Sequence, residues 1–165
     1  FELARLEHGG VVLDLQVFSL PDLVQDVFQK FELAAQARGQ TLAAEIPPGL
    51  PAVQADLGLI ERVLTNLLDN AIRHTPAGGR ITVALRALDG DVQVSVSDTG
   101  PGIPTERRDQ LFSTLPALGS QRPDSGGLGL LIVHRILQLH HRQIHLLDSD
   151  EGAAFEFSLP TARHR

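Results

Sequence analysis

The most informative stretch of the chain reads Asn66-Leu67-Leu68-Asp69-Asn70-Ala71-Ile72-Arg73-His74-Thr75. The spacing i, i+4 and i+7 places the side chains of Asn66, Asn70 and Arg73 on one face of a helix. Apolar residues recur around them with a period of about 3.6, which predicts a helix that buries a wide stripe against a core. These residues are Ile60, Val63, Leu64, Leu67, Leu68, Ala71 and Ile72. Asp56 is a suitable N-cap for this helix. The polar triplet is either a solvated helix back or a patch that contacts a ligand.

A second polar motif follows a predicted strand. Val92, Val94 and Val96 alternate with polar residues, which is typical of a strand with one buried face. The strand leads into Asp98-Thr99-Gly100-Pro101-Gly102. Glycines allow a tight turn or a close approach to a ligand, and a carboxylate accepts hydrogen bonds from an amine. The motif alone also fits a plain turn at the end of a strand.

A third motif is the glycine cluster in Ser125-Gly126-Gly127-Leu128-Gly129-Leu130-Leu131-Ile132-Val133, which opens a long apolar helix. The first N–H groups of a helix have no partner within the helix, and they lie at the positive end of its dipole. With no side chains in the way, an anion such as phosphate can approach these groups. The alternative is a flexible loop that happens to precede a helix.

Length and composition indicate one domain. A chain of 165 residues buries about 70% of its unfolded surface, enough for a single core. The net charge of -6 argues against nonspecific binding to nucleic acid or to a membrane surface. The absence of cysteine excludes disulfides and thiolate metal sites. No apolar run reaches the roughly 20 residues that span a bilayer, and no signal peptide is visible. Because the chain begins at Phe1 and contains no Met, we expect a piece of a longer protein.

The remaining pattern alternates helices and strands. After an extended piece at 11–17, Pro21 begins a helix that Gly39 ends. Strands are predicted at 42–46, 52–55, 81–87, from Val92, at 144–147 and at 154–159, with a hairpin turn at Asp89-Gly90. A last helix is predicted from Gly129 to about His140, apolar almost all round. We therefore expect an α+β fold, a two-layer sandwich of a mixed, mostly antiparallel sheet with about three helices on one face.

Taken together and in this order, the motifs resemble the ATP-binding catalytic domain of sensor histidine kinases, in the superfamily that includes DNA gyrase. Asn66 to Thr75 looks like the N box, Asp98 to Gly102 like the G1 box, Leu111-Phe112 like the F box, and Gly127-Leu128-Gly129-Leu130 like the G2 box. The resemblance covers nearly the whole chain. It implies that residues 1–8 end a preceding dimerisation helix, residues 9–160 form the ATP-binding domain, with 155–160 as its final strand, and residues 161–165 form a tail.

The resemblance also implies a role for each site residue. Asn70 matches the Mg²⁺-binding Asn, and Asn66 matches the position where gyrase-like ATPases carry a Glu that activates water. An amide cannot accept that proton, so the chain is better suited to holding ATP for transfer than to hydrolysis. Asp98 matches the carboxylate that accepts from the adenine amino group. The other matched positions are Arg73 on phosphate, His74 beside the nucleotide, Gly100 and Gly102 at the base pocket, Phe112 bracing a lid at 113–126, and Gly126, Gly127, Leu128 and Gly129 at the phosphate end.

The implied function is phosphoryl transfer from ATP, with Mg²⁺, to a histidine on the dimerisation domain and then to the receiver domain of a response regulator. The chain contains no His-Glu or His-Asp phosphoacceptor motif, since His8 is followed by Gly9. The resemblance implies a cytoplasmic domain that does not itself contact the membrane, and it leaves open whether the parent protein is anchored in the inner membrane.

Two departures from the family pattern concern turns. Ser125 stands where relatives usually have Gly, which bears on lid closure. Gln143 stands where they commonly have Gly, which bears on the turn after the last helix.

A Walker-type NTPase is excluded because no G-x-x-x-x-G-K sequence occurs. Asn66 in place of Glu argues against a gyrase-like or chaperone ATPase. A serine kinase of the same superfamily and a degenerate nucleotide-sensing or partner-binding module stay open. His140, His141 and His145 lack organised carboxylate or Cys partners, so we interpret them as surface histidines.

Overall fold

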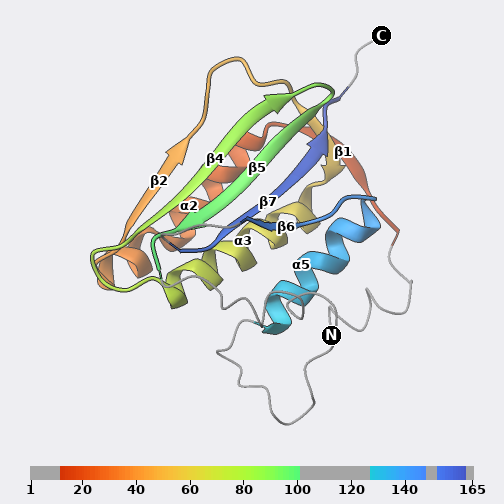
Figure 1. Ribbon diagram of the computed structural model, residues 1–165. Helices are drawn as coiled ribbons and strands as arrows, with labels where there is room; N and C mark the ends of the chain where they lie inside the picture. Colours follow the sequence, from red (N-terminus) through yellow and green to blue (C-terminus); the bar gives the residue numbers. More distant parts are fainter. Residues whose placement is uncertain (1–11, 101–126, 148–151, 163–165) are drawn as a thin grey trace.

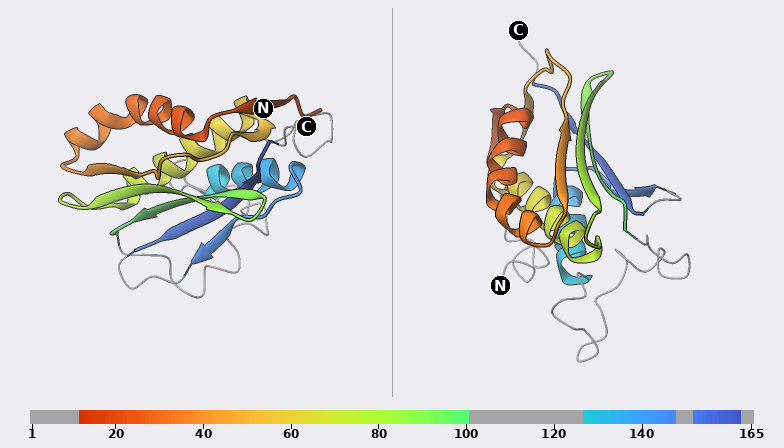
Figure 2. Two further views of the ribbon diagram at one scale, coloured as in Figure 1. Left: turned by 90° about the horizontal axis from the view of Figure 1, so that it is seen from above. Right: turned by 90° about the vertical axis from the view of Figure 1, so that its left-hand side faces the viewer.

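The computed structural model describes residues 12–100, 127–147 and 152–162, and within them it has the predicted α+β architecture. The helices are α2 (Leu20–Ala37), α3 (Leu57–His74) and α5 (Gly127–Leu139). The strands are β1 (Leu15–Phe18), β2 (Thr41–Glu45), β3 (Val53–Asp56), β4 (Arg80–Leu88), β5 (Asp91–Asp98), β6 (His145–Leu147) and β7 (Ala154–Pro160). All three helices cover the same face of the main sheet (Figures 1 and 2).

The main sheet is mixed, as predicted. Its strand order is β2-β4-β5-β7-β6, with β2 parallel to β4 and every other neighbouring pair antiparallel. A second sheet, which the sequence pattern did not predict, pairs β1 with β3 in antiparallel fashion. The extended piece expected at 11–17 is the strand Leu15–Phe18, and Val11 lies outside the described residues.

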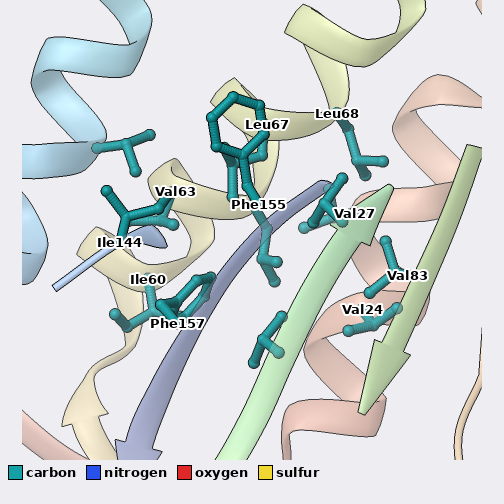
Figure 3. Packing of buried hydrophobic residues seen from close by; sticks show 14 of the residues in the cluster. Val24, Val27, Ile60, Val63, Leu67, Leu68, Val83, Ile144, Phe155 and Phe157 are labelled. Carbon is teal, nitrogen blue, oxygen red and sulfur yellow. The ribbon is translucent and has the colours of Figure 1, made fainter. Parts of the chain in front are cut away.

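The core lies between the helices and the sheet, because each element is apolar on the side that faces the other layer. Val92, Val94 and Val96 of β5 are buried, and so are Phe155, Phe157 and Leu159 of β7, in register beside them. From the helix side, Ile60, Val63, Leu67 and Leu68 of α3 pack over these strands (Figure 3). The periodicity of α3 and the nearly all-round burial of α5 are thus confirmed. In the described part of the chain, no helix is both long enough and apolar enough to cross a membrane.

Local signals in the sequence determine where α2 and α3 begin and where α2 ends. The Asp56 carboxylate accepts a hydrogen bond from the Leu59 backbone N–H at 3.1 Å, which confirms it as the N-cap of α3. The Ser19 hydroxyl is the N-cap of α2, where it accepts a hydrogen bond from the Asp22 backbone N–H. At the end of α2, Gly39 has φ +70, and the N–H groups of Gly39 and Gln40 donate to the carbonyls of Gln36 and Ala35. This is the Schellman arrangement, in which glycine adopts the left-handed conformation without strain.

The turn after α5 forms despite the Gln143 departure. His141 takes the left-handed conformation there, with φ 59, and its N–H donates to the Gln138 carbonyl at 3.0 Å. The Arg142 N–H donates to the Leu137 carbonyl at 2.8 Å, which completes a second Schellman turn. A non-glycine residue therefore occupies the left-handed position, at some cost in conformational energy.

Candidate functional site

The polar face of α3 connects two of the predicted motifs. The Asn66 side-chain amide donates to the Gly129 carbonyl at 3.1 Å, in the first turns of α5. An ideal Cβ at Gly129 would lie 3.8 Å from the same amide nitrogen, so the two helices approach closely at this glycine. The beginning of α5 therefore contacts the polar face of α3 at Asn66.

One and two turns further along α3 are Asn70 and His74. Asn70 is only 9% exposed, which is unusual for an amide and argues against the solvated helix back. A ring nitrogen of His74, Nδ1, lies 2.8 Å from the Asn70 backbone carbonyl, which fixes the imidazole at the end of the helix. Asn66, Asn70 and His74, spaced four residues apart, thus form one polar line along α3.

The line ends on the Asp98 motif. A Cβ added to Gly100 would lie 2.6 Å from the His74 carbonyl oxygen, so only glycine lets the turn pass beneath the end of α3. Asp98 is the last residue of β5 and is 9% exposed. Its Oδ1 accepts from the Gly100 N–H at 2.8 Å and from the Ala153 N–H at 3.4 Å. Both donors that the described residues supply use Oδ1.

Burial raises the pKa of the Asp98 carboxyl above its ordinary value, because a charge is poorly solvated there. The hydrogen bonds from Gly100 and Ala153, and the nearby charge of His74, oppose this shift. The carboxylate is thus kept in an environment that costs free energy to the folded protein. Functional sites often hold groups whose pKa is shifted by burial, which makes Asp98 a candidate ligand-binding residue.

Sequence reasoning missed Gly152 as part of the same site. The sequence predicts only a turn at Ser149 to Gly152, between the last two predicted strands. Gly152 has φ 137, and an added Cβ would lie 2.1 Å from the Asp98 backbone oxygen and 2.8 Å from Oδ1. No local signal in the sequence distinguishes Gly152 from an ordinary turn glycine, because its constraint comes from the distant Asp98 backbone.

Arg73 lies beside this line, at the edge of a surface hollow. Its Nε pairs with Asp69 at 3.2 Å, and its backbone carbonyl accepts from the Arg38 guanidinium at 3.3 Å. The hollow, about 560 Å³ in volume, is lined by Arg38, Arg73, His74, Thr75, Pro76, Thr99 and Gly100. Basic groups therefore flank the end of α3 on its exposed side.

The structure thus brings together six of the predicted site residues along a continuous path: Asn66, Asn70, His74, Asp98, Gly100 and Gly129. Arg73 lies next to the path, and Gly127 and Leu128 form the beginning of α5. Gly102, Phe112, Gly126 and the proposed lid at 113–126 lie outside the described residues.

The interpretation of His140 as a surface histidine is wrong. Its Nδ1 lies 2.8 Å from the Ile136 carbonyl, and its Nε2 accepts from the Asp56 backbone N–H at 3.0 Å. His140 therefore joins the end of α5 to the N-cap of α3. His141 and His145 are exposed, as expected. No group of three metal-ligating side chains occurs in the part of the chain that the structure describes.

Comparison with known families shows which family the chain belongs to. A family model described as "Histidine kinase-, DNA gyrase B-, and HSP90-like ATPase" matches residues 55–163, a range that includes the polar face of α3, the Asp98 motif and α5. The chain belongs to this family of ATPases. The resemblance drawn from the sequence motifs is confirmed.

Curated relatives show which members of this ATPase family the chain is similar to. The chain is 42% identical over 148 residues to the adaptive-response sensory kinase SasA of Rippkaea orientalis. The aligned region covers 87% of this chain and 38% of that relative. The SasA of Thermosynechococcus vestitus is 39% identical over 161 residues, which is 95% of this chain and 42% of that protein. The chain thus spans about two fifths of the length of these curated relatives.

Solved structures agree with the sequence comparison. The catalytic domain of histidine kinase ThkA has a TM-score of 0.79 at 30% identity and covers 90% of this chain and 96% of its own. Full-length ShkA in complex with AMPPNP has a TM-score of 0.85 at 29% identity and covers 99% of this chain and 34% of that one. More particularly, then, the chain is a histidine kinase catalytic domain of this ATPase family.

Proposed function

We propose that this domain binds ATP with Mg²⁺ along the line of Asn66, Asn70 and His74, and donates the γ-phosphate to a histidine on a dimerisation domain of the same protein. A response regulator receiver domain would take the phosphate next. The observation that carries the proposal is the polar line on α3, which runs from the glycine end of α5 to the buried Asp98 carboxylate. We assign the adenine to the Asp98 end of this line and the phosphates to the α5 end.

At the adenine end, Asp98 Oδ2 would accept a hydrogen bond from the exocyclic amino group. The backbone donors on Oδ1 hold the carboxylate in one orientation before the ligand arrives. A buried, pre-oriented acceptor discriminates strongly, since a base without an amino group would leave the carboxylate without a partner. Gly100 and Gly152 keep this position free of Cβ atoms, and we propose that Gly102 contributes to the same pocket.

At the phosphate end, the described residues fit a magnesium ion bound jointly by protein and phosphates. Mg²⁺ is usually held by one or two protein oxygens together with water and phosphate oxygens. The buried Asn70 would supply one such amide oxygen, and no cluster of three metal-ligating side chains occurs in the described ranges. When bound, Mg²⁺ would neutralise charge on the phosphates. Asn66 has no base function, so the site would hold ATP rather than activate water.

The remaining contacts would enclose the phosphates. Arg73 would approach them from the exposed side of α3. Gly127, Leu128 and Gly129 would present the N–H groups at the beginning of α5, with Gly126 immediately before them. Phe112 would support a lid over the nucleotide. These roles follow from the family motif, and each is a proposal for this chain.

Relatives support the proposed partners. ThkA has been crystallised in complex with the response regulator protein TrrA; the chain is 29% identical to it, with a TM-score of 0.81, and covers 46% of that kinase chain. ShkA has been crystallised with AMPPNP, an ATP analogue. We propose the corresponding partners for the parent of this chain, with the domain acting on the cytoplasmic side.

The test is autophosphorylation of the parent kinase with Mg-ATP, read as acid-labile phosphohistidine. We expect phosphohistidine in the wild-type protein and none with Asn70→Ala. Gln54→Ala, on the exposed side of β3, serves as the control and is expected to match the wild type. A wild-type kinase without phosphohistidine, or full activity in Asn70→Ala, would refute the proposed function or the role of Asn70, respectively.

A further inference from the structure

We propose that Gln40 is a positioning residue for the nucleotide site, because its side chain holds the end of α3 against the turn that follows α2. This inference rests on the proposed function and adds a residue that lies outside every predicted motif. Gln40 is 7% exposed and occupies the position just after the Gly39 turn. The backbone N–H of Gln40 donates to the Ala35 carbonyl at 2.9 Å, which holds the backbone of Gln40 against the end of α2.

The side chain of Gln40 donates hydrogen bonds to backbone carbonyls at the end of α3, which have no partner within the helix. The last four carbonyls of a helix have no partner within it. The Nε2 group of Gln40 donates to the Ile72 carbonyl at 2.8 Å and also to the Thr75 carbonyl. Arg38, two residues earlier in the same turn, donates to the Arg73 carbonyl at 3.3 Å. Three hydrogen bonds from side chains to backbone carbonyls thus connect one short turn to the end of α3.

Backbone hydrogen bonds connect the turn after α2 to the segment that follows α3. The Gly78 N–H donates to the Gly39 carbonyl at 2.8 Å, and the Thr41 N–H donates to the Gly79 carbonyl at 3.0 Å. From Thr41 and Arg80 onward these two segments of the chain continue side by side as the parallel strands β2 and β4. These bonds lie on the strand side of the end of α3, whereas the Gln40 amide reaches the helix itself.

The end of α3 is in turn in contact with the adenine end of the site. The His74 carbonyl lies so close to Gly100 that no Cβ would fit between them. The Gly100 N–H orients the Asp98 carboxylate, and His74 lies in the last turn of the helix that Gln40 holds. A displacement of this turn would therefore move Gly100 and His74 together, and with them the acceptor for adenine.

The hydrogen-bond donors are the important part of the Gln40 side chain. Its Oε1 is buried and has no hydrogen-bond partner within the described residues, whereas Nε2 has two. A lysine at this position would supply donors and place a positive charge at the negative end of the helix dipole. A glutamate would turn an acceptor toward two carbonyls. Donor capacity and side-chain shape can therefore be separated by substitution.

The experiment measures ADP affinity of this chain in the presence of Mg²⁺ by calorimetry, well below the unfolding temperature of every variant. We expect Gln40→Met, which preserves shape but has no donor, to weaken ADP binding at least tenfold. Gln40→Glu should weaken it further, and Gln40→Lys should stay within threefold of the wild type. Val24→Ala is the control, because it removes core volume near the opposite end of α2. It should lower stability and leave ADP affinity unchanged.

The outcomes separate the two levels of the proposal. If the wild-type chain bound no ADP, both the proposed function and this inference would be overturned. If it bound ADP and Gln40→Met bound equally well, the inference alone would be overturned. An equal loss of affinity in Val24→Ala and Gln40→Met would also overturn it, since the effect would then follow stability rather than position.

Discussion

Gly152 offers a sharp test of how the Asp98 pocket is built, through the substitution Gly152→Ala. At φ 137 an L-residue is strained, which costs about 1–3 kcal/mol. The new Cβ would also lie 2.1 Å from the Asp98 backbone oxygen, so backbone must move. Such overpacking costs about 1–3 kcal/mol more. For a domain of this size, a total of about 4 kcal/mol lowers the unfolding midpoint by roughly 8–16 °C.

A matched control separates strain from collision. Gly49 also has a positive φ, +78, but an added Cβ meets nothing within 4 Å. Gly49→Ala should therefore show the conformational cost alone, about 1 kcal/mol, or roughly 2–4 °C in midpoint. Thermal unfolding by calorimetry and ADP titration are run on both variants. Gly152→Ala should also lose ADP affinity, whereas Gly49→Ala should keep it. Equal midpoints and equal affinities for the two variants would refute the reasoning.

Three further predictions concern single side chains. His141→Gly should raise the free energy of unfolding by about 1 kcal/mol, because glycine tolerates the left-handed turn after α5; an unchanged value in urea denaturation would contradict this. His140→Ala should lower it by about 1–3 kcal/mol, since the Asp56 N–H loses its acceptor, and the same denaturation experiment measures the loss. Burial raises the pKa of the Asp98 carboxyl, so the folded protein keeps the carboxyl proton to higher pH than the unfolded chain does. The contribution of Asp98 to the free energy of unfolding therefore falls as the pH rises from the ordinary pKa through the raised pKa. The stability of Asp98→Asn relative to the wild type should therefore increase across that interval, and a difference independent of pH would disprove the burial cost.

Local and periodic features were predictable from sequence. The period of α3, its N-cap at Asp56 and the alternation of β5 each depend on residues close together in the chain, so the elements and the mixed sheet were expected correctly. The family resemblance implied that Asn66 and the glycines at the beginning of α5 belong to one nucleotide site. Its geometry, an amide on the Gly129 carbonyl, required the structure.

Features that depend on distant backbone contacts were not predictable in the same way. Gln40 has no distinguishing local pattern, and its partners are 32 and 35 residues further along the chain. Gly152 is indistinguishable in sequence from an ordinary turn glycine, because its constraint comes from a strand more than fifty residues earlier. His140 was misjudged for the same reason: its partner, the Asp56 N–H, lies 84 residues away.

The central claim is that Asp98 is the adenine acceptor of a nucleotide site, and ligand-induced stabilisation tests it most directly. Thermal unfolding of the wild-type chain and of Asp98→Asn is measured with and without ADP and Mg²⁺. Ligand at 100 times its Kd should stabilise the wild-type protein by about 2.7 kcal/mol, a midpoint rise of roughly 5–10 °C. Asp98→Asn should fold and show no rise. No rise in the wild-type protein at saturating nucleotide, or the same rise in Asp98→Asn, would contradict the claim.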